Sequence, residues 1–373
     1  MVGFRVDASR STPLVQQIQQ GFKARILSHE LPGGTRLPSI RRMSREFGCS
    51  PGIVERATAS LTAEGFLDAE PRRGFFVSHT AGQARRSRDV ALVLPSLRLE
   101  AMSCIIQGVR EGLGESGFRL LVQSADEDYD DQLHLLEYLR HSELAGVVIA
   151  PPIDDTYAAP IRDFALRGTP VVLATRVLDD CDNLDTVTVD NLEYGRTAIS
   201  YLLDRGHRRI ATVGCNTASL ANRQVLEGIE AGLRRHRMTP EDLVQIPLDT
   251  FEFNLDRPWQ NAAEAVGEFL DGDTAGVTAL LGWSHYMSLG AFRALSERGI
   301  PVPDAVSLLS MGHNMEAFSV LQPAITVVQN PFRAVSERAA RRLVEVIERG
   351  DDPAQQIRVA PALIEGQSVA ALR

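Results

Sequence analysis

The sequence predicts a small α+β head followed by a much larger α/β body that has two lobes. The 373 residues exceed the length of one ordinary domain and favour a division into parts. Short helix patterns and a hairpin pattern occur before residue 78, whereas strand and helix patterns alternate regularly from residue 89 onward. We therefore expect a head at residues 1–78, a linker at 79–88 and a body at 89–373.

The head begins with an amphipathic helix between Thr12 and Ser28. Its apolar side chains recur at helical spacing and form one stripe, made of Leu14, Ile18, Phe22, Ile26 and Leu27. Because a single apolar stripe needs a partner surface, we expect this helix to pack against the helices that follow it.

Two short helices joined by a tight turn come next. Leu37-Pro38-Ser39 begins the first of them and Gly48 ends it. Ser50-Pro51 then supplies a hydroxyl N-cap and a preset φ for the second. This pattern is typical of a helix-turn-helix, in which the second helix enters the major groove of DNA.

A hairpin pattern follows the second helix, which ends at Gly65. Two short apolar runs, Phe66-Leu67 and Phe75–Val77, flank a turn at Pro71-Arg72-Arg73-Gly74. The head is therefore predicted to be a winged helix-turn-helix with a three-helix core.

The charge of the chain is divided unevenly between these parts. Residues 1–88 hold 14 Lys+Arg against 7 Asp+Glu, whereas the remainder holds 25 against 41. A basic head on an acidic body indicates a polyanionic partner, here double-stranded DNA, for the head alone.

Several classes of chemistry are disfavoured by composition. The four cysteines, Cys49, Cys104, Cys181 and Cys215, lie far apart without a CxxC pair, so we expect reduced thiols and no metal site. Lys23 is the only lysine, which argues against a pyridoxal-phosphate Schiff base in the body. We expect no cofactor and no enzyme activity.

Neither a membrane span nor a secretion signal is indicated by the sequence. No window approaches 18 uninterrupted apolar residues, and the first residues lack a charged-then-apolar pattern. We therefore expect a cytoplasmic protein.

Residues 79–88 form a polar linker without apolar periodicity, and the body follows it. Short Val, Ile and Leu runs alternate with amphipathic segments, which indicates parallel sheets covered on both faces. The predicted strands are Val90–Leu94, Phe118–Gln123, Gly146–Ala150, Pro170–Ala174, Thr186–Val189, Arg209–Gly214, Leu243–Pro247, Val277–Leu281 and Val306–Ser310.

The motifs of the head resemble the GntR family of winged-helix bacterial transcription regulators. These motifs are PGG-T-R-LPS-I-RR-M, GCS-x-x-x-V, L-x-x-EGF and the RRG turn, over about residues 12–78. The resemblance and the charge pattern together imply a set of DNA-binding residues, namely Arg36, Ser39, Arg41, Arg42, Ser50, Gly52, Arg56, Arg72, Arg73 and Gly74. Arg36, Arg42 and Arg45 are expected on phosphates, which position the head without specifying a sequence.

The second helix departs from the family pattern at two positions. Pro51 and Glu55 stand where the family often has arginine, and an acidic side chain is repelled by phosphate unless it accepts from a cytosine amino group. We therefore expect sequence specificity to shift toward Arg41, Arg56 and the wing.

The body resembles the effector domain of LacI-type regulators, which share the periplasmic-binding-protein fold. The motifs are AGVVIAPP, GTPVVLATR, VTVDNLEYGRTAISYLLDRGHRRIATVG, NRQVLEGIEAGLRR, SLGAFRALSERGIPVPDAVSLLSMG and QPAITVVQNPFRAVSERAARRLVEVI. The resemblance implies a homodimer and two lobes around a ligand cleft. It also implies crossovers near Asp190, Pro323–Thr326 and Pro353, which would assign residues 89–189 and 326–352 to the first lobe and 190–325 and 353–373 to the second.

The same resemblance implies a set of ligand-binding residues in the cleft. They are Arg176, Asp190, Arg223, Trp259, Ser284, His285, His313 and Phe332. Ser284-His285 replaces a common Asn-Asp, and Gly312-His313 lacks a common aspartate. Because acceptors for sugar hydroxyls are missing while Arg223 stays, an anionic or less hydroxylated ligand is favoured over a neutral hexose. The two histidines are expected to bind such a ligand near neutral pH.

These patterns predict a homodimeric, ligand-responsive transcription regulator, with repression favoured, that binds a pseudo-palindromic operator. The effector is expected to be a sugar, a sugar acid or a related metabolite. Three alternatives stay open. They are a solute-binding protein, an enzyme joined to a regulator head, and a DNA-binding protein whose cleft no longer binds an effector.

Overall fold

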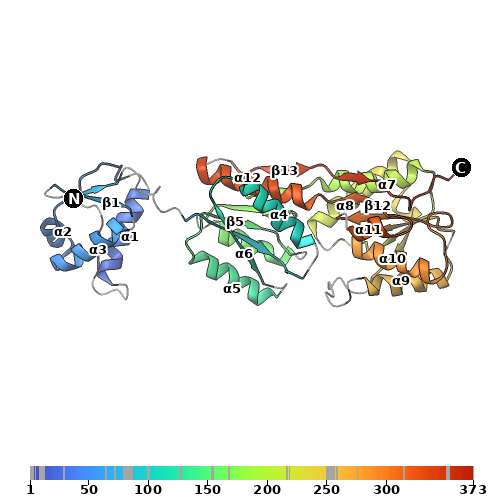
Figure 1. Cartoon of the computed structure of the whole chain (residues 1–373), viewed down its shortest axis with the longest axis horizontal. Coiled ribbons are helices and arrows are strands. Elements are labelled where there is room, and N and C mark those ends of the chain that lie inside the picture. Colours follow the sequence, from blue (N-terminus) through green and yellow to red (C-terminus); the bar gives the residue numbers. More distant parts are fainter. Residues whose placement is uncertain are drawn as a thin grey trace. The chain divides into compact units, whose positions relative to one another are not determined.

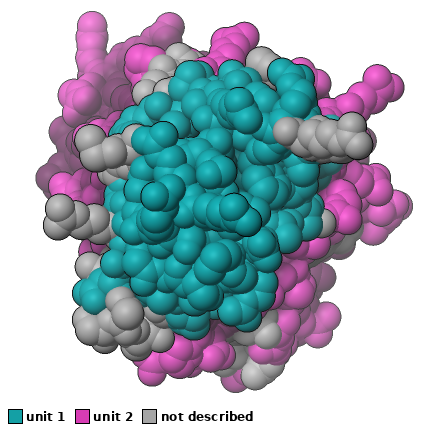
Figure 2. Space-filling model, turned by 90° about the vertical axis from the view of Figure 1, so that its left-hand side faces the viewer, with its two compact units in different colours: residues 1–88 teal, residues 89–373 magenta. Residues whose placement is uncertain are grey.

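The computed structural model divides the chain into two compact units, Met1–Arg88 and Asp89–Arg373, which Figure 2 colours separately. Each unit is described here by itself. The structure describes residues 4, 6–7, 13–27, 30–63, 65–70, 73–78, 87–98, 101–125, 128–152, 155–166, 169–215, 217, 219–248, 257, 259–274, 276–313, 316–349 and 353–372. The predicted linker at 79–88 lies outside these residues except for 87–88.

The first unit consists of three helices and a two-stranded hairpin (Figure 1). The elements are α1 (Leu14–Leu27), α2 (Ile40–Phe47), α3 (Pro51–Ala63), β1 (Leu67–Glu70) and β2 (Gly74–Val77). The predicted winged helix-turn-helix is present in this order. Its core joins side chains from all three helices and both strands, among them Phe22, Met43, Val54, Leu67 and Val77, each at most 1% exposed.

Two glycines give the head its sharp turns. Gly48 ends α2 in the left-handed region with φ 64°, and Gly65 follows α3 with φ 76°, a conformation that glycine adopts without steric cost. The hairpin then pairs antiparallel from Leu67 opposite Val77 to Glu70 opposite Gly74. A bridge between Arg36 and Phe76 ties the segment before α2 to the wing.

The second unit contains two six-stranded sheets, each covered by helices on both faces (Figure 1). The first sheet has the order β13-β7-β6-β5-β3-β4 and is parallel throughout. Its strands are β3 (Asp89–Leu94), β4 (Arg119–Ser124), β5 (Gly146–Ile149), β6 (Val171–Ala174), β7 (Asp185–Val189) and β13 (Gln356–Val359). Helices α4 (Ala101–Leu113) and α12 (Phe332–Arg349) cover one face, and α5 (Tyr129–Arg140) and α6 (Ala158–Ala165) cover the other.

The second sheet has the order β14-β12-β11-β10-β8-β9, and only β14 runs antiparallel to its neighbour. Its strands are β8 (Ile210–Val213), β9 (Leu243–Ile246), β10 (Ala279–Gly282), β11 (Ser307–Gly312), β12 (Thr326–Gln329) and β14 (Ala362–Ile364). Helices α7 (Asn191–Asp204) and α8 (Leu220–Arg235) cover one face, whereas α9 (Gln260–Asp271) and α10 (His285–Glu297) cover the other. The short α11 (Glu316–Val320) precedes β12.

The chain crosses between the lobes three times, and two of these crossings differ from the prediction. The first lies at Asp190, between β7 and α7, as expected. The second lies at 330–331 and the third at 360–361, because β12 pairs with β11 in the second sheet and β13 pairs with β7 in the first. The predicted lobe bounds of 326–352 and 353–373 are therefore wrong: residues 326–329 belong to the second lobe and residues 332–359 to the first.

Pairs of helices pack closely on one face of each sheet. A Cβ at Gly108 of α4 would lie 2.2 Å from the carbonyl oxygen of Arg333 in α12, and a Cβ at Gly228 of α8 would lie 2.0 Å from that of Leu192 in α7. Larger residues at these two positions would force the helices apart. None of the described helices is long and apolar enough to cross a membrane.

Candidate functional site

The described residues of the predicted DNA-binding surface all lie exposed on the first unit. They are Arg36, Ser39, Arg41, Arg42, Ser50, Gly52, Arg56, Arg73 and Gly74. The tenth predicted residue, Arg72, lies outside the described residues. These side chains come from the segment before α2, from α2, from the start of α3 and from the wing, which are the parts of a winged helix-turn-helix that meet DNA.

The arginines of this surface differ in their partners. Arg42 pairs with Glu46 at 3.0 Å, and Arg73 pairs with Glu70. Arg41 and Arg56 have no carboxylate partner within the part of the chain that the structure describes. Their charges are therefore available to phosphates or base edges without breaking an ion pair.

The first turn of α3 presents an unusual surface. Pro51, Gly52 and Glu55 are all exposed. A Cβ added at Gly52 would meet nothing within 4 Å, and its φ is not positive, so the fold of the head does not require glycine there. The bare backbone at the start of this helix therefore favours close approach by a partner.

Arg36 and Arg73 both lie over the ring of Phe76 in the wing. Their guanidinium carbons are 6.0 Å and 5.2 Å from the ring centroid. Stacking of this kind holds a long side chain in place while leaving its donors available. The wing thus holds two ordered guanidinium groups, of which that of Arg73 is also paired with Glu70.

The second unit contains a cavity of about 190 Å³ between its two lobes. The first lobe contributes the start of α4 and the residues that follow β5 and β6. The second lobe contributes α7, α8 and the residues that follow β10, and Phe332 enters from the second crossing. Ligands of parallel α/β sheets bind at the carboxyl ends of strands, and this cavity occupies that position in both lobes.

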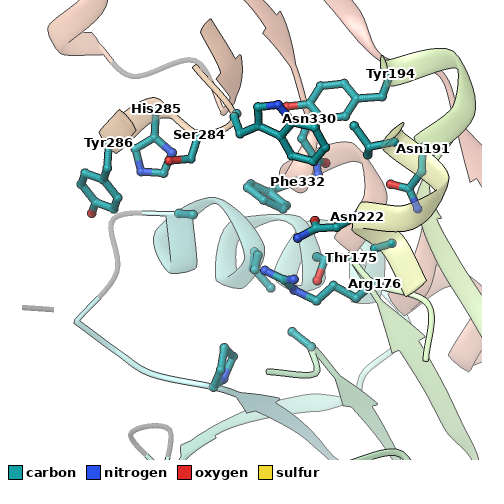
Figure 3. A pocket seen from close by; sticks show the side chains of 18 of the residues that line it. Thr175, Arg176, Asn191, Tyr194, Asn222, Ser284, His285, Tyr286, Asn330 and Phe332 are labelled. Carbon is teal, nitrogen blue, oxygen red and sulfur yellow. The ribbon is translucent and has the colours of Figure 1, made fainter. Parts of the chain in front are cut away.

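Four of the eight predicted ligand-binding residues line the cavity, namely Arg176, Ser284, His285 and Phe332. Figure 3 shows Arg176 at one end of the cavity and Ser284 and His285 at the other, with Phe332 between them. Ser284 also caps α10, because its hydroxyl accepts from the Met287 amide at 3.2 Å.

The other four predicted residues do not line the cavity. Asp190 caps α7, since its side chain accepts from the Glu193 amide at 3.1 Å. Arg223 turns to Asp179, at 2.8 Å. Trp259 is the N-cap residue of α9, and its carbonyl oxygen lies 2.5 Å from where a Cβ of Gly290 would stand.

His313 lies behind His285 instead of facing the cavity. The two ring centroids are 3.9 Å apart, and the side chains are buried. Burial lowers the pKa of His313 to about 4, and burial together with the neighbouring His313 lowers the pKa of His285 well below its usual value. Both rings are therefore neutral near pH 7, so the pair adds no positive charge for an anionic ligand there.

Several residues of the cavity wall were not predicted. They include Thr175, Asn191, Tyr194, Asn222, Trp283, Tyr286 and Asn330. Trp283 directly follows β10 and Asn330 directly follows β12, so the rule that sites form at the carboxyl ends of strands would have found both. Asn191, Tyr194 and Asn222 stand on α7 and α8, and helical spacing does not reveal that they face a neighbouring lobe.

Three polar atoms at the cavity are buried without a hydrogen-bond partner among the described residues. They are Trp283 Nε1, His285 Nε2 and Asn330 Oδ1. Leaving a buried polar group unpaired costs about 1–3 kcal/mol. Atoms of this kind are therefore expected to gain a partner when a ligand enters.

The backbone is strained where the first lobe meets the cavity. Thr175 has a φ of 73° and is buried, although a β-branched residue disfavours this region strongly. Its amide donates to the Val187 carbonyl at 2.8 Å, and its carbonyl accepts from the Thr188 hydroxyl at 3.1 Å. These bonds hold the turn that carries Arg176 to the cavity wall.

Comparisons with known proteins agree with both units. Residues 14–77 match the bacterial regulatory proteins of the gntR family, and residues 199–369 match a periplasmic binding protein-like domain. The "Arabinose metabolism transcriptional repressor" of Geobacillus stearothermophilus is 23% identical over 366 residues, which cover 95% of this chain and 97% of that protein. The "HTH-type transcriptional repressor PurR" of Salmonella arizonae is 25% identical over 300 residues, with coverage of 80% and 82%.

Solved structures show the same fold. The "transcriptional regulator CelR-cellobiose complex" superposes with a TM-score of 0.65 at 21% identity and covers 96% of this chain and all of that one. A LacI family regulator from Enterococcus faecium with bound ribose superposes with a TM-score of 0.64 at 19% identity and covers 76% of this chain and all of that one.

A basic helix-turn-helix head and a two-lobed body, together with these matches, define a DNA-binding transcription regulator. More narrowly, the head matches the model of the gntR family, and the body matches a periplasmic binding protein-like domain and has the fold of the LacI family regulators with which it superposes.

Proposed function

We propose that this chain is a cytoplasmic, homodimeric repressor that binds a pseudo-palindromic operator and responds to a small sugar-like or anionic metabolite. The observation that carries this proposal is the cavity, whose wall is built from both lobes. A ligand held there contacts both lobes at once, so binding favours one relative arrangement of the lobes over others.

The head supports the DNA part of the proposal. Arg41 and Arg56 are exposed without a carboxylate partner among the described residues, and Gly52 leaves the start of α3 bare. Two copies of such a head, related by a two-fold axis, fit two half-sites about one helical turn of DNA apart.

Relatives support the regulatory part. The relatives include the "Arabinose metabolism transcriptional repressor" and the "HTH-type transcriptional repressor PurR", and solved neighbours hold cellobiose or ribose. Coupling between an effector and operator DNA is commonly about 1–3 kcal/mol, which corresponds to roughly 5- to 150-fold in affinity.

Three measurements test this proposal on the full chain. Footprinting with DNA upstream of its own gene is expected to show a protected site with two related halves, and sedimentation is expected to show a dimer. A thermal-shift screen of sugars, sugar acids and phosphates is then expected to find a compound that binds. That compound is expected to change operator affinity. A protected site that no bound compound affects would favour the alternative of a ligand-independent DNA-binding protein.

A further inference from the structure

The outward face of α3 is made mostly of small residues. Four residues of this helix are buried in the core of the head, namely Val54, Ala57, Thr58 and Leu61. The opposite face is exposed at spacings of three and four, through Gly52, Glu55, Arg56, Ala59 and Ala63. Glu55 and Arg56 are the charged side chains of α3. Because the other three residues are glycine or alanine, these two stand above a surface of small residues.

Glu55 is exposed and has no basic partner among the described residues. A partner on the same helix would stand three or four positions away, and those positions hold Pro51, Gly52, Thr58 and Ala59. Arg56 is one position away, where side chains do not face each other, and its Nε donates to the Gly52 carbonyl at 3.4 Å. The carboxylate of Glu55 is therefore open to an external partner.

Stabilisation of α3 does not explain an acid at this position. An acidic residue stabilises the N-terminus of a helix mainly within the first turn. The helix begins at Pro51, so Glu55 is its fifth residue and lies beyond that turn. A phosphate would repel this carboxylate, so a contact with DNA at Glu55 requires a donor on the edge of a base.

The four bases differ in what they offer to a carboxylate, which only accepts hydrogen bonds. In the major groove cytosine presents its N4 amino group. Guanine presents the acceptors N7 and O6, thymine presents the acceptor O4, and adenine has the acceptor N7 beside its N6 amino group. Cytosine is therefore the base that donates to a carboxylate without an acceptor of its own beside the donor.

We propose that Glu55 selects a cytosine in each half of the operator, with its carboxylate accepting from the N4 amino group. Gly52 and Ala59 lie three residues before it and four residues after it on the same face, and their small size allows a base edge to approach. The same charge disfavours guanine and thymine, whose acceptors it would face. The proposal rests on the proposed function in taking α3 as the helix that enters the major groove.

Selection from a pool of duplexes with randomised sequence tests the proposal on the full chain. The parent is expected to enrich sequences with two related halves that hold cytosine at one matching position. Glu55→Gln is expected to change the preference at that position to adenine, because a glutamine amide pairs with N6 and N7 of adenine. The preferences at the other positions should stay as they are in the parent.

Titration of fixed duplexes measures the size of the effect. Replacing the selected cytosine by thymine in both halves is expected to weaken binding by the parent about tenfold or more. The same replacement should cost Glu55→Gln much less. Glu30→Gln removes a negative charge from an exposed residue that follows α1 and is paired with Arg25. This matched control is expected to keep the preference of the parent.

Base preferences that Glu55→Gln leaves unchanged overturn the proposal, even if this variant binds every duplex more tightly through the loss of a repelling charge. The proposed function then stands, because the operator is still recognised. Failure of the parent to enrich any sequence overturns both. Thermal unfolding of Glu55→Gln is expected to match that of the parent, and a lower midpoint with a uniform loss of binding would show a structural role for Glu55 instead.

Discussion

Arg223 of the second lobe forms an ion pair with Asp179 of the first lobe, with 2.8 Å between the guanidinium nitrogen and the carboxylate oxygen. The family resemblance placed Arg223 on the ligand, whereas the structure joins it to the opposite lobe at the edge of the cavity. The side chains are 39% and 48% exposed, so solvent screens the pair strongly and its contribution to stability is expected to stay below about 1 kcal/mol.

The first prediction separates a tie between the lobes from a contact with the ligand. If Arg223 acts as a tie, Arg223→Ala and Asp179→Ala shift the affinity for a bound compound in the same direction, and the double variant adds little to either. Titration of the three variants measures this. Opposite effects, with Asp179→Ala tightening binding and Arg223→Ala weakening it, would show instead that Arg223 moves onto the ligand.

The second prediction concerns the two tryptophans of the chain. Trp283 lines the cavity and Trp259 does not. A compound that enters the cavity is expected to change the fluorescence of Trp283 by altering the surroundings of its indole. The Trp259→Phe protein should keep the ligand-dependent change and the Trp283→Phe protein should lose it, and the reverse result would contradict this assignment of the cavity.

A third prediction follows from the buried His285 and His313 pair. Because the pKa of His313 is lowered to about 4 in the folded chain, the unfolded chain binds a proton that the folded chain does not between about pH 6.5 and 4. The free energy of unfolding therefore falls as the pH is lowered through this window. A shift of this size is worth at most about 3 kcal/mol.

Chemical unfolding of His313→Gln between pH 7.5 and 4.5 checks the third prediction. The variant is expected to show a weaker dependence of stability on pH than the parent. His134→Gln, at an exposed position on α5, is the matched control and should keep the slope of the parent. An unchanged slope for His313→Gln would refute the role given to the pair.

The fourth prediction concerns Gly52 at the start of α3. Alanine there meets no neighbouring atom within 4 Å and has a higher helix propensity, so Gly52→Ala is expected to stabilise the head by up to about 1 kcal/mol. The added methyl group stands where close approach to DNA is expected, so operator affinity should fall although stability rises. Thermal unfolding and operator titration measure the two effects, and an affinity that rises with stability would contradict this explanation.

The fifth prediction concerns Arg41 and Arg56. Replacing an arginine that contacts a phosphate makes the slope of log affinity against log salt concentration shallower by about one. Replacing an arginine that reads a base costs about 1–3 kcal/mol of binding free energy and relaxes specificity. We expect Arg41→Ala and Arg56→Ala each to weaken operator binding by at least tenfold. Arg25→Ala on α1, where the arginine is already paired with Glu30, is the control, and equal losses in all three variants would indicate a nonspecific effect of charge.

Much of the fold follows from local patterns in the sequence. The strand and helix alternation of the body and the helix-turn-helix of the head were predicted because hydrophobic period and glycine position act over a few residues. The crossings at 330–331 and 360–361 were misplaced because strand partnership is decided by pairing over long distances in sequence. β12 belongs to the second sheet because it pairs with β11, and only this pairing shows it.

The cavity was predicted less completely for a similar physical reason. Arg176, Ser284, His285 and Phe332 follow strand ends or crossings, where the topology alone directs side chains to the cleft. Whether Arg223 and Trp259 reach the cavity depends on which neighbours compete for them. Here Arg223 pairs with Asp179, and Trp259 is the N-cap residue of α9. The neutral state of the two histidines depends on burial, which the sequence does not reveal.

The interleaving of the two lobes also bears on how the chain is made. The first sheet receives its edge strand, β13, and its covering helix, α12, only after the ribosome has passed residue 359, long after β3 to β7 have emerged. The head has all of its elements by residue 77. A premature stop codon anywhere between these points is therefore expected to yield a finished DNA-binding head on an unfinished body, a product that competes for DNA without responding to a metabolite.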